Sequence, residues 1–520
     1  MPIEKIPFSQ TNSFSGFFLD YIDQNKHLKP FYNRYPSIDS FKDQIAEKKK
    51  NFNNSFRQVL STTLEAQYKD IDTSPLVKDN IKKLNNDSTF TITTGHQLNL
   101  FTGPLYFIYK IVSVINTCRL LQKAYPKNHF VPVYWMASED HDFDEIKYFR
   151  LDGKKYVWES NQTGAVGRFD PSELKVLLEQ IPGNTKVFKD AYLKHASLSD
   201  AVRYYVNELF GDEGLIVVDA DHRNLKSLFK NVLKDDLNVH SAKKKVDVEN
   251  KKLEQLGYSV QVHAREINLF YLDKSLRSRI EKQDDQYKVV DTELSFSSNE
   301  VEKIIVEEPE KLSPNVILRP VYQEAILPNL AYIGGPAEVV YWLQLKSTFE
   351  HFGITFPIVM PRNFAMVIDA PLWRKFEKTK LTIADLFTPK DELLTHWTMA
   401  NAQHDLSTLK EIKEVDSMYS SLLERAHKLD PTLDSMVKAE QKRIQSSLTK
   451  IEKKMIRAEK RFQQDKLGQI SALKDSLFPS GSPQERVDNF LNFYQQDSGF
   501  LRSLLDKFDP FDFRMNIVTP

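Results

Sequence analysis

The sequence predicts an α/β fold in which an open parallel sheet with inserted connecting segments is followed by a long antiparallel helical hairpin. Three observations support this prediction. Residues 89–136 read strand, helix, strand, as in a βαβ unit. Further short apolar runs alternate with helical patterns. Beyond residue 409, apolar residues recur at alternating steps of three and four.

The βαβ unit consists of "TFTITT" at 89–94, a mostly apolar helix from about 105, and "HFVPVYWMA" at 129–137. Residues before about 85 read as mostly helical. Further strands are expected at 214–220, 267–273, 315–321, 330–334 and 356–360. Polar stretches at about 152–210 and 280–315 are interpreted as insertions, so residues 1–388 form the predicted α/β core.

The heptad pattern predicts two long helices within residues 389–478, joined at Asp430–Pro431. The seam of the first is Leu409, Ile412, Val415, Tyr419, Leu422 and Ala426, and that of the second is Ile444, Leu448, Ile451, Met455, Ala458 and Phe462. The second arm, residues 432–475, has 11 Lys/Arg and 6 Asp/Glu. This charge is typical of a solvated face, and the alternative is a binding surface for a phosphate-bearing ligand or a partner. Residues 479–520 are expected to return to the core as a helical segment.

Composition limits the functional classes. Lys plus Arg equals Asp plus Glu at 71 each, so no bulk charge favours nucleic acid or an anionic membrane as partner. The single cysteine, Cys118, excludes a disulfide within the chain and fits a reducing compartment. We find neither a signal peptide nor an apolar run of bilayer length, and we expect a cytoplasmic protein.

The first candidate site segment is "TITTGHQLNLFTGPLYFIYK" at 91–110, where a strand opens into a glycine-bounded loop before a helix. Ligands of open α/β sheets bind beyond the carboxyl ends of strands, and a helix N-terminus favours an anion. The predicted substrate contacts in this segment are Gly95, His96, Gln97, Thr102, Gly103, Tyr106 and Lys110. The alternative is a plain turn with a capping histidine.

The second segment is "VPVYWMASEDHDFDE" at 131–145, where a strand runs into clustered carboxylates around one histidine. Mutual repulsion raises carboxylate pKa values and suits general acid/base work. The predicted catalytic group is Glu139, Asp140, His141, Asp142 and Asp144. Mg²⁺ could also relieve the repulsion, but the spacing matches no known metal loop, and no metal is predicted. A solvated loop capping the next helix is the other alternative.

The third segment, Leu318–Lys346, contains "LAYIGGPAEVVYW", which again reads strand, glycine turn and helix. An arginine is a natural clamp for a carboxylate or phosphate. Arg319, Gln323, Gly334, Gly335 and Glu338 are the predicted substrate contacts, and the alternative pairs Arg319 with a core carboxylate. "LIVVDADHRNLK" at 215–226 could add another wall or simply cap a helix.

These three segments, in order, together with "PQERVDNFLNFY" near the C-terminus, resemble the signature blocks of the bacillithiol biosynthesis cysteine-adding enzyme family. The resemblance covers nearly the whole chain, although many members have Gln where this chain has His96. It implies a Rossmann-like core with inserted segments, and a coiled coil that mediates homodimerisation. It also implies a ligase that joins L-cysteine to the amine of glucosaminyl-malate in the last step of bacillithiol synthesis.

A free carboxylate acylates an amine poorly, so activation as a phosphate or adenylate ester is expected, with ATP as the implied nucleotide. The resemblance also associates a nucleotide site with the region near the coiled coil, apart from the core crevice. We find no counterpart of the second, lysine-rich signature of class I synthetases. Two alternative functions are a dimeric coiled-coil binding or scaffold protein, and a nucleotidyltransferase that acts on another small acid.

Overall fold

A five-stranded parallel sheet lies at the centre of the computed structural model, which describes residues 3–519. Its order is β13-β12-β2-β3-β6, and all neighbours run parallel. The strands are β2 (Thr89–His96), β3 (His129–Met136), β6 (Ile216–Asp219), β12 (Asn329–Gly334) and β13 (Ile358–Pro361). The chain runs outward from β2 to β6 and resumes on the other side of β2 with β12. The topological switch point, where such sheets bind ligands, therefore lies between β2 and β12.

Helices cover both faces of this sheet. Helix α5 (Tyr106–Ala124) packs against β2 and β3, and its buried free Cys118 lies in an apolar cluster with Phe90 and Ile92. On the opposite face the ring of Tyr322, from α14 (Leu318–Ile326), lies 5.4 Å from that of Trp135. Cover on both sides explains why nearly every residue of these strands is buried, including the threonines of β2. The predicted βαβ unit and parallel sheet are confirmed.

The expectation of a strand at 315–321 is wrong, because this segment starts helix α14. The side chain of Asn315 accepts hydrogen bonds from the amides of Ile317 and Leu318, at 2.8 and 3.3 Å, and so caps the first turn. Pro320 lies in that turn, where a missing N–H costs little. The β-branched residues Val316, Ile317 and Val321 around the start of the helix explain why this segment resembles a strand in the sequence.

The second insertion is a five-stranded sheet, ordered β10-β9-β8-β7-β11, whose neighbours run antiparallel. Its strands are β7 (Leu269–Asp273), β8 (Leu276–Gln283), β9 (Gln286–Val289), β10 (Ser295–Ser297) and β11 (Leu312–Pro314). The insertion thus begins before the expected residue 280. The strand expected at 267–273 exists, but it belongs to this sheet and not to the parallel core.

Residues 152–210 are more ordered than their polar sequence indicates. After the hairpin of β4 (Tyr148–Leu151) and β5 (Lys154–Val157), three helices follow, α7 (Lys175–Gln180), α8 (Lys186–Lys194) and α9 (Leu198–Phe210). The rings of Phe188 and Tyr205, from α8 and α9, lie 5.1 Å apart within the main hydrophobic core. This insertion is therefore part of the core packing.

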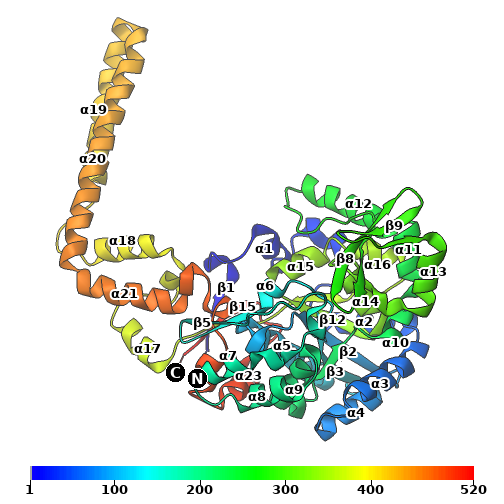
Figure 1. Cartoon of the computed structure of the whole chain (residues 1–520). Coiled ribbons are helices and arrows are strands. Elements are labelled where there is room, and N and C mark those ends of the chain that lie inside the picture. Colours follow the sequence, from blue (N-terminus) through cyan, green and yellow to red (C-terminus); the bar gives the residue numbers. More distant parts are fainter. Residues whose placement is uncertain (1–2, 520) are drawn as a thin grey trace.

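The heptad segments form the antiparallel pair α19 (Leu409–Leu429) and α20 (Asp434–Phe462), which projects from the body as a rod (Figure 1). At the turn, the Asp430 side chain accepts a hydrogen bond from the amide of Thr432. Helices α18 (Lys390–Ala400) and α21 (Gln464–Leu477) form its base, beside α17 (Ala370–Glu377). The predicted coiled-coil hairpin is confirmed.

The C-terminal segment returns to the body through α22 (Leu491–Tyr494) and α23 (Phe500–Lys507). It ends in a strand that the sequence analysis did not anticipate, β15 (Arg514–Val518). This strand lies between β1 (Ile3–Pro7), with which it is antiparallel, and β14 (Phe364–Val367), with which it is parallel. The two ends of the described chain therefore share one small sheet.

Candidate functional site

A cavity of about 1000 Å³ lies at the carboxyl ends of β2, β3, β12 and β13. Its lining includes Gly95, His96 and Gln97 at the end of β2, residues 135–140 at the end of β3, Gly335 to Glu338 after β12, and Arg362 after β13. Arg319 of α14 and residues 261–263 of an inserted loop also line it. The three segments singled out in the sequence thus meet at the switch point between β2 and β12.

Lys110 and Glu338 form an ion pair on one wall of the cavity. The Nζ atom of Lys110 lies 2.5 Å from Oε2 of Glu338 and donates to the carbonyl oxygen of Gly95 at 2.8 Å. Glu338 also accepts hydrogen bonds from the Tyr332 hydroxyl and the Gly335 amide. Burial opposes ionisation of Glu338, but these partners hold its pKa below the ordinary value. The amide of Gly335, expected to be open to substrate, is therefore already satisfied.

His96 is a half-buried histidine that lines the cavity. Its ring lies 5.3 Å from that of Tyr106 and 5.2 Å from that of Phe107, and its Nε2 atom is buried without a hydrogen-bond partner. Burial, and then the charges of Lys110 and Arg362, lower its pKa well below the ordinary value. The imidazole can thus give or accept one hydrogen bond but does not carry charge at neutral pH.

Arg319 presents a cation that no carboxylate in residues 3–519 neutralises by an ion pair. Its Nη1 atom donates to Oε1 of Gln323 at 3.0 Å, its Nη2 atom lies 3.4 Å from the Tyr341 hydroxyl, and its guanidinium lies 5.6 Å from the Tyr332 ring centroid. Burial acts to lower its pKa, but Tyr341, Tyr332 and Glu338 raise the pKa above the ordinary value. The alternative that pairs Arg319 with a core carboxylate does not hold. Gln323 itself does not line the cavity but supports Arg319 from behind.

The acidic segment after β3 divides between the cavity and the solvent. Asp140 lines the cavity, accepts from Nε2 of Gln97 at 2.9 Å, and caps the amide of His141 at 2.7 Å. Glu139 also lines it, but its carboxylate contacts Nζ of the buried Lys226, while burial raises the pKa of Glu139. Asp140 also pairs with Nη1 of Arg277, but at 3.7 Å, a longer contact than that between Glu139 and Lys226. Among the predicted catalytic residues, Asp140 is therefore the carboxylate more available to a ligand.

The other three predicted catalytic residues do not line the cavity. Asp142 is exposed, and Asp144 is exposed and paired with Lys147 at 2.7 Å. The Nδ1 atom of His141 lies 2.6 Å from Nη1 of Arg277. Partial burial, and then Arg277, lower the pKa of His141. Within residues 3–519 no group of three or more His, Cys, Asp or Glu residues is arranged to hold a metal ion.

Three further predicted contacts lie behind the cavity wall. Gly103 has a φ of +62°, and a Cβ atom there would lie 2.5 Å from Cβ of Asn99, so its role is conformational. Thr102 is buried beside it, and Gly334 ends β12. The helix N-terminus after Gly103 is also not open, because the amide of Leu105 donates to the carbonyl oxygen of Asp488.

Several cavity residues were missed. The arginine that follows β13, Arg362, obeys the same carboxyl-end rule that found the other walls and could have been predicted. Arg277, whose guanidinium lies 4.0 Å from the Phe270 ring centroid, comes from the antiparallel insertion, where no sequence signal linked it to the core. The other two missed arginines of the cavity lining are Arg265 of the inserted loop and Arg486 of the C-terminal return.

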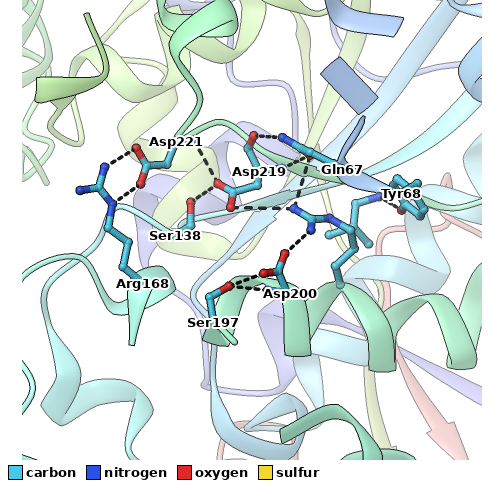
Figure 2. A network of polar contacts seen from close by, with 10 residues as sticks. Gln67, Tyr68, Ser138, Arg168, Ser197, Asp200, Asp219 and Asp221 are labelled. Carbon is cyan, nitrogen blue, oxygen red and sulfur yellow. Dashed lines mark hydrogen bonds and ion pairs between the residues drawn. The ribbon is translucent and has the colours of Figure 1, made fainter. Parts of the chain in front are cut away.

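The segment after β6 forms a structural network instead of a cavity wall (Figure 2). Asp219 accepts from the Ser138 hydroxyl at 2.5 Å, and Asp221 forms a bidentate pair with Arg168 at 2.8 and 3.0 Å. His222 caps the next helix through the amide of Asn224. This network fixes the first insertion to the edge of the core sheet.

Fold and site together define a Rossmann-like α/β protein with a coiled-coil appendage and a crevice lined by five arginines. A family model described as "Bacillithiol biosynthesis BshC, N-terminal Rossmann-like domain" matches residues 1–363. A second, described as "Bacillithiol biosynthesis BshC, C-terminal coiled-coil domain", matches residues 365–520. The chain belongs to this BshC family of bacillithiol biosynthesis.

Individual relatives agree with the family models. Proteins named "Putative cysteine ligase BshC" are 42% identical to the chain in Flavobacterium johnsoniae, with 100% of both chains covered, and 41% identical in Flavobacterium psychrophilum, with 100% and 99% covered. One from Cytophaga hutchinsonii is 39% identical, with 99% and 98% covered. Among residues 3–519, no helix has the length and apolar character needed to cross a membrane.

Proposed function

We propose that this enzyme joins the carboxyl group of L-cysteine to the amine of glucosaminyl-malate, in the cytoplasm, as the last step of bacillithiol synthesis. The observation that carries the proposal is the guanidinium of Arg319, which faces the cavity without a carboxylate partner. A free, oriented guanidinium is suited to bind a carboxylate in bidentate geometry. Glucosaminyl-malate carries two carboxylates.

Charge in the cavity supports an anionic substrate. The positive charges of Lys110 and Arg362 are used by Glu338 and Glu485. Arg265, Arg319 and Arg486 line the cavity, and no ion pair with them is found in residues 3–519. An incoming dicarboxylate would therefore meet guanidinium groups whose charge the protein leaves available.

Asp140 is the proposed general base. Its carboxylate lines the cavity and is oriented by Nε2 of Gln97. In the proposed reaction the amine nitrogen forms a bond to the activated cysteine carbonyl carbon, the leaving group departs with its bonding electrons, and Asp140 takes the proton lost by nitrogen. Glu139 is less suited to this role because the buried Lys226 contacts its carboxylate more closely than Arg277 contacts that of Asp140, at 3.7 Å.

ATP is the proposed source of activation for the cysteine carboxylate. The arginines without ion pairs in the cavity are the residues that could hold phosphate oxygens beside the cysteine carboxylate. The chain's own task in this proposal is to orient the two substrates and to accept the amine proton.

We also infer that the enzyme is a homodimer associated through α19 and α20. Apolar side chains remain exposed on both helices, with Met418 51% exposed and Met436 57% exposed. Regular apolar positions left open on a two-helix rod favour burial against a second copy.

The direct test incubates the purified protein with L-cysteine and glucosaminyl-malate, with and without ATP, and measures the amide product by mass spectrometry. We expect product only with ATP, and a loss of about 10-fold to 100-fold in kcat/KM for Arg319→Lys, because lysine cannot form the bidentate contact. No product under either condition contradicts the ligase proposal. Stabilisation by nucleotide together with another small acid, but not by glucosaminyl-malate, would favour a nucleotidyltransferase.

A cellular test separates the enzyme from a scaffold. If the protein is a scaffold whose functional part is the coiled coil, Arg319→Ala and Asp140→Ala should leave cellular bacillithiol unchanged. The ligase proposal predicts that both variants lower it strongly while the proteins still accumulate.

A further inference from the structure

The C-terminal return reaches the cavity and is held there by buried polar contacts. The side chain of Gln484 accepts from the amide of Val367 at 2.9 Å and donates to its carbonyl oxygen at 3.1 Å. The carboxylate of Glu485 accepts two hydrogen bonds from Arg362, at 2.6 and 2.9 Å, and one from the amide of Ala365. Gln484, Glu485 and Arg362 are each 3% exposed, so this attachment is internal and well defined.

The same segment also holds the loop between β2 and α5. The side-chain amide of Asn489 donates to the carbonyl oxygens of Phe101 and Gly103, both at 2.7 Å. The amide of Leu105 donates to the carbonyl oxygen of Asp488 at 2.8 Å. Residues 484–489 are thus fixed to two separate elements that border the cavity.

Arg486 lies in the middle of this fixed segment and behaves differently from its neighbours. It is exposed, it lines the cavity, and no side-chain hydrogen bond or ion pair is found for it within residues 3–519. Its charge acts on the nearby Tyr106. Burial raises the pKa of Tyr106, and the positive charges of Arg362 and Arg486 act to lower it. The backbone that carries Arg486 is thus held by buried contacts on both sides, while its guanidinium is left available at the cavity.

Arg486 is also distinctive in its origin. The other cavity-lining residues of the described chain lie between Gly95 and Arg362, within the part matched by the Rossmann-like family model, whereas Arg486 belongs to the part matched by the coiled-coil model. The C-terminal part of the chain therefore contributes directly to the cavity.

We propose that Arg486 is a substrate-binding residue that contacts an oxyanion of the ligand, as a second anion contact in addition to Arg319. This inference rests on the proposed function for the identity of that anion, a carboxylate of the malate group. A phosphate oxygen is the other source with the same chemistry. Glu485 acts as a positioning residue, because its pair with Arg362 fixes the turn that carries Arg486.

The test measures binding without turnover. Full-length wild type, Arg486→Ala, Arg486→Lys and Arg502→Ala are titrated by calorimetry with glucosaminyl-malate, L-malate and inorganic phosphate. Arg502 is the matched control, since it is an exposed arginine of α23 in the same C-terminal part, paired with Asp506. We expect about a tenfold weaker Kd for the malate ligands in Arg486→Ala, partial recovery in Arg486→Lys and no change in Arg502→Ala.

The outcomes separate this inference from the proposed function. A weakened Kd for phosphate alone supports the oxyanion contact and assigns it to a phosphate. An unchanged Kd for every anion in Arg486→Ala, or no anion binding by the wild type, overturns the inference even if product still forms. Anion binding that depends on Arg486 without any amide product removes the proposed ligase activity and leaves the inference standing. Glu485→Gln should weaken the same Kd, with a thermal midpoint measured alongside to report folding.

Discussion

Lys48 and Glu324 form a buried ion pair directly behind the cavity wall, with Nζ of Lys48 3.4 Å from Oε2 of Glu324. Both side chains are at most 1% exposed. The other carboxylate oxygen of Glu324 accepts from Nε2 of Gln323 at 2.9 Å, and Oε1 of Gln323 accepts from Arg319 at 3.0 Å. A continuous polar chain therefore runs from the interior to Arg319, which lines the cavity.

This chain predicts that Glu324→Gln is costly although the site is remote. The variant leaves the ammonium of Lys48 buried without a counter-charge, and removing one partner of such a pair costs about 3–5 kcal/mol. Chemical unfolding monitored by fluorescence should show a large drop in midpoint. The double variant Lys48→Met/Glu324→Gln removes both charges and should be closer to wild type. Equal destabilisation of the single and double variants would show that the cost of Glu324→Gln does not come from the unpaired ammonium of Lys48.

His96 predicts a specific pH dependence of stability. Its pKa in the folded chain lies well below the ordinary value because the ring is buried beside Lys110 and Arg362. As pH falls below about 6.5, the unfolded chain binds a proton that the folded chain does not, so stability decreases toward acid by up to about 1.4 kcal/mol per pH unit. The loss is absent at pH values well above 6.5, where the imidazole is neutral in both the folded and the unfolded chain.

The matched variant for this effect is His96→Gln, which removes the titrating group. Unfolding free energies of both proteins at pH 7.5 and pH 5.0 give the contribution of His96 by difference. The loss between the two pH values should be smaller in His96→Gln. The same loss in both proteins would mean that the imidazole is protonated in the folded chain.

Asp140 and Asp142 provide an internal comparison for catalysis. Asp140 lines the cavity, whereas Asp142, two residues away in the same acidic segment, is exposed outside it. If Asp140 accepts the amine proton, Asp140→Asn should lower kcat by about 10²-fold to 10⁴-fold. Asp142→Asn should leave kcat near the wild-type value. A similar kcat for both variants in amide formation would assign the proton transfer elsewhere.

The rod formed by α19 and α20 predicts a concentration-dependent dimer. Met418 and Leu422 of α19 are 51% and 38% exposed, and a second copy would bury them. The double variant Met418→Glu/Leu422→Glu should therefore shift the protein to a monomer in sedimentation analysis, because charges at an apolar seam are expensive to bury. Ser421→Glu, on an exposed position of the same helix, should remain dimeric. A monomeric wild type would contradict the proposed homodimer.

Sequence reasoning located those parts of the site that depend on local rules. A strand followed by glycine or polar residues, as at Gly95, Asp140 and Gly335, predicts the carboxyl edge of a parallel sheet. The same rule applied to Arg362 would have added another wall. The heptad spacing likewise predicted both the long helices and the turn at Asp430.

Tertiary contacts determine the parts of the site that the sequence could not predict. The helix start after Gly103 looked open to an anion, but Asp488, almost 400 residues away, satisfies the first amide. Arg277 and Arg486 reach the cavity from an insertion and from the C-terminal return, so no local pattern could place them there. The helix at 318–326 was mistaken for a strand because the β-branched residues Val316, Ile317 and Val321 lie around its start and favour a strand in the sequence.

The pairing of β15 with β1 and β14 has a consequence for biosynthesis. During translation, residues 3–7 must wait for residues 514–518 before they find their neighbour, and Arg486 emerges late as well. Such distant pairing is slow because a very long loop has to close. A ribosome-bound nascent chain can thus assemble the parallel sheet, which ends at residue 361, before Arg486 has been made, and the crevice is finished only after that residue has emerged.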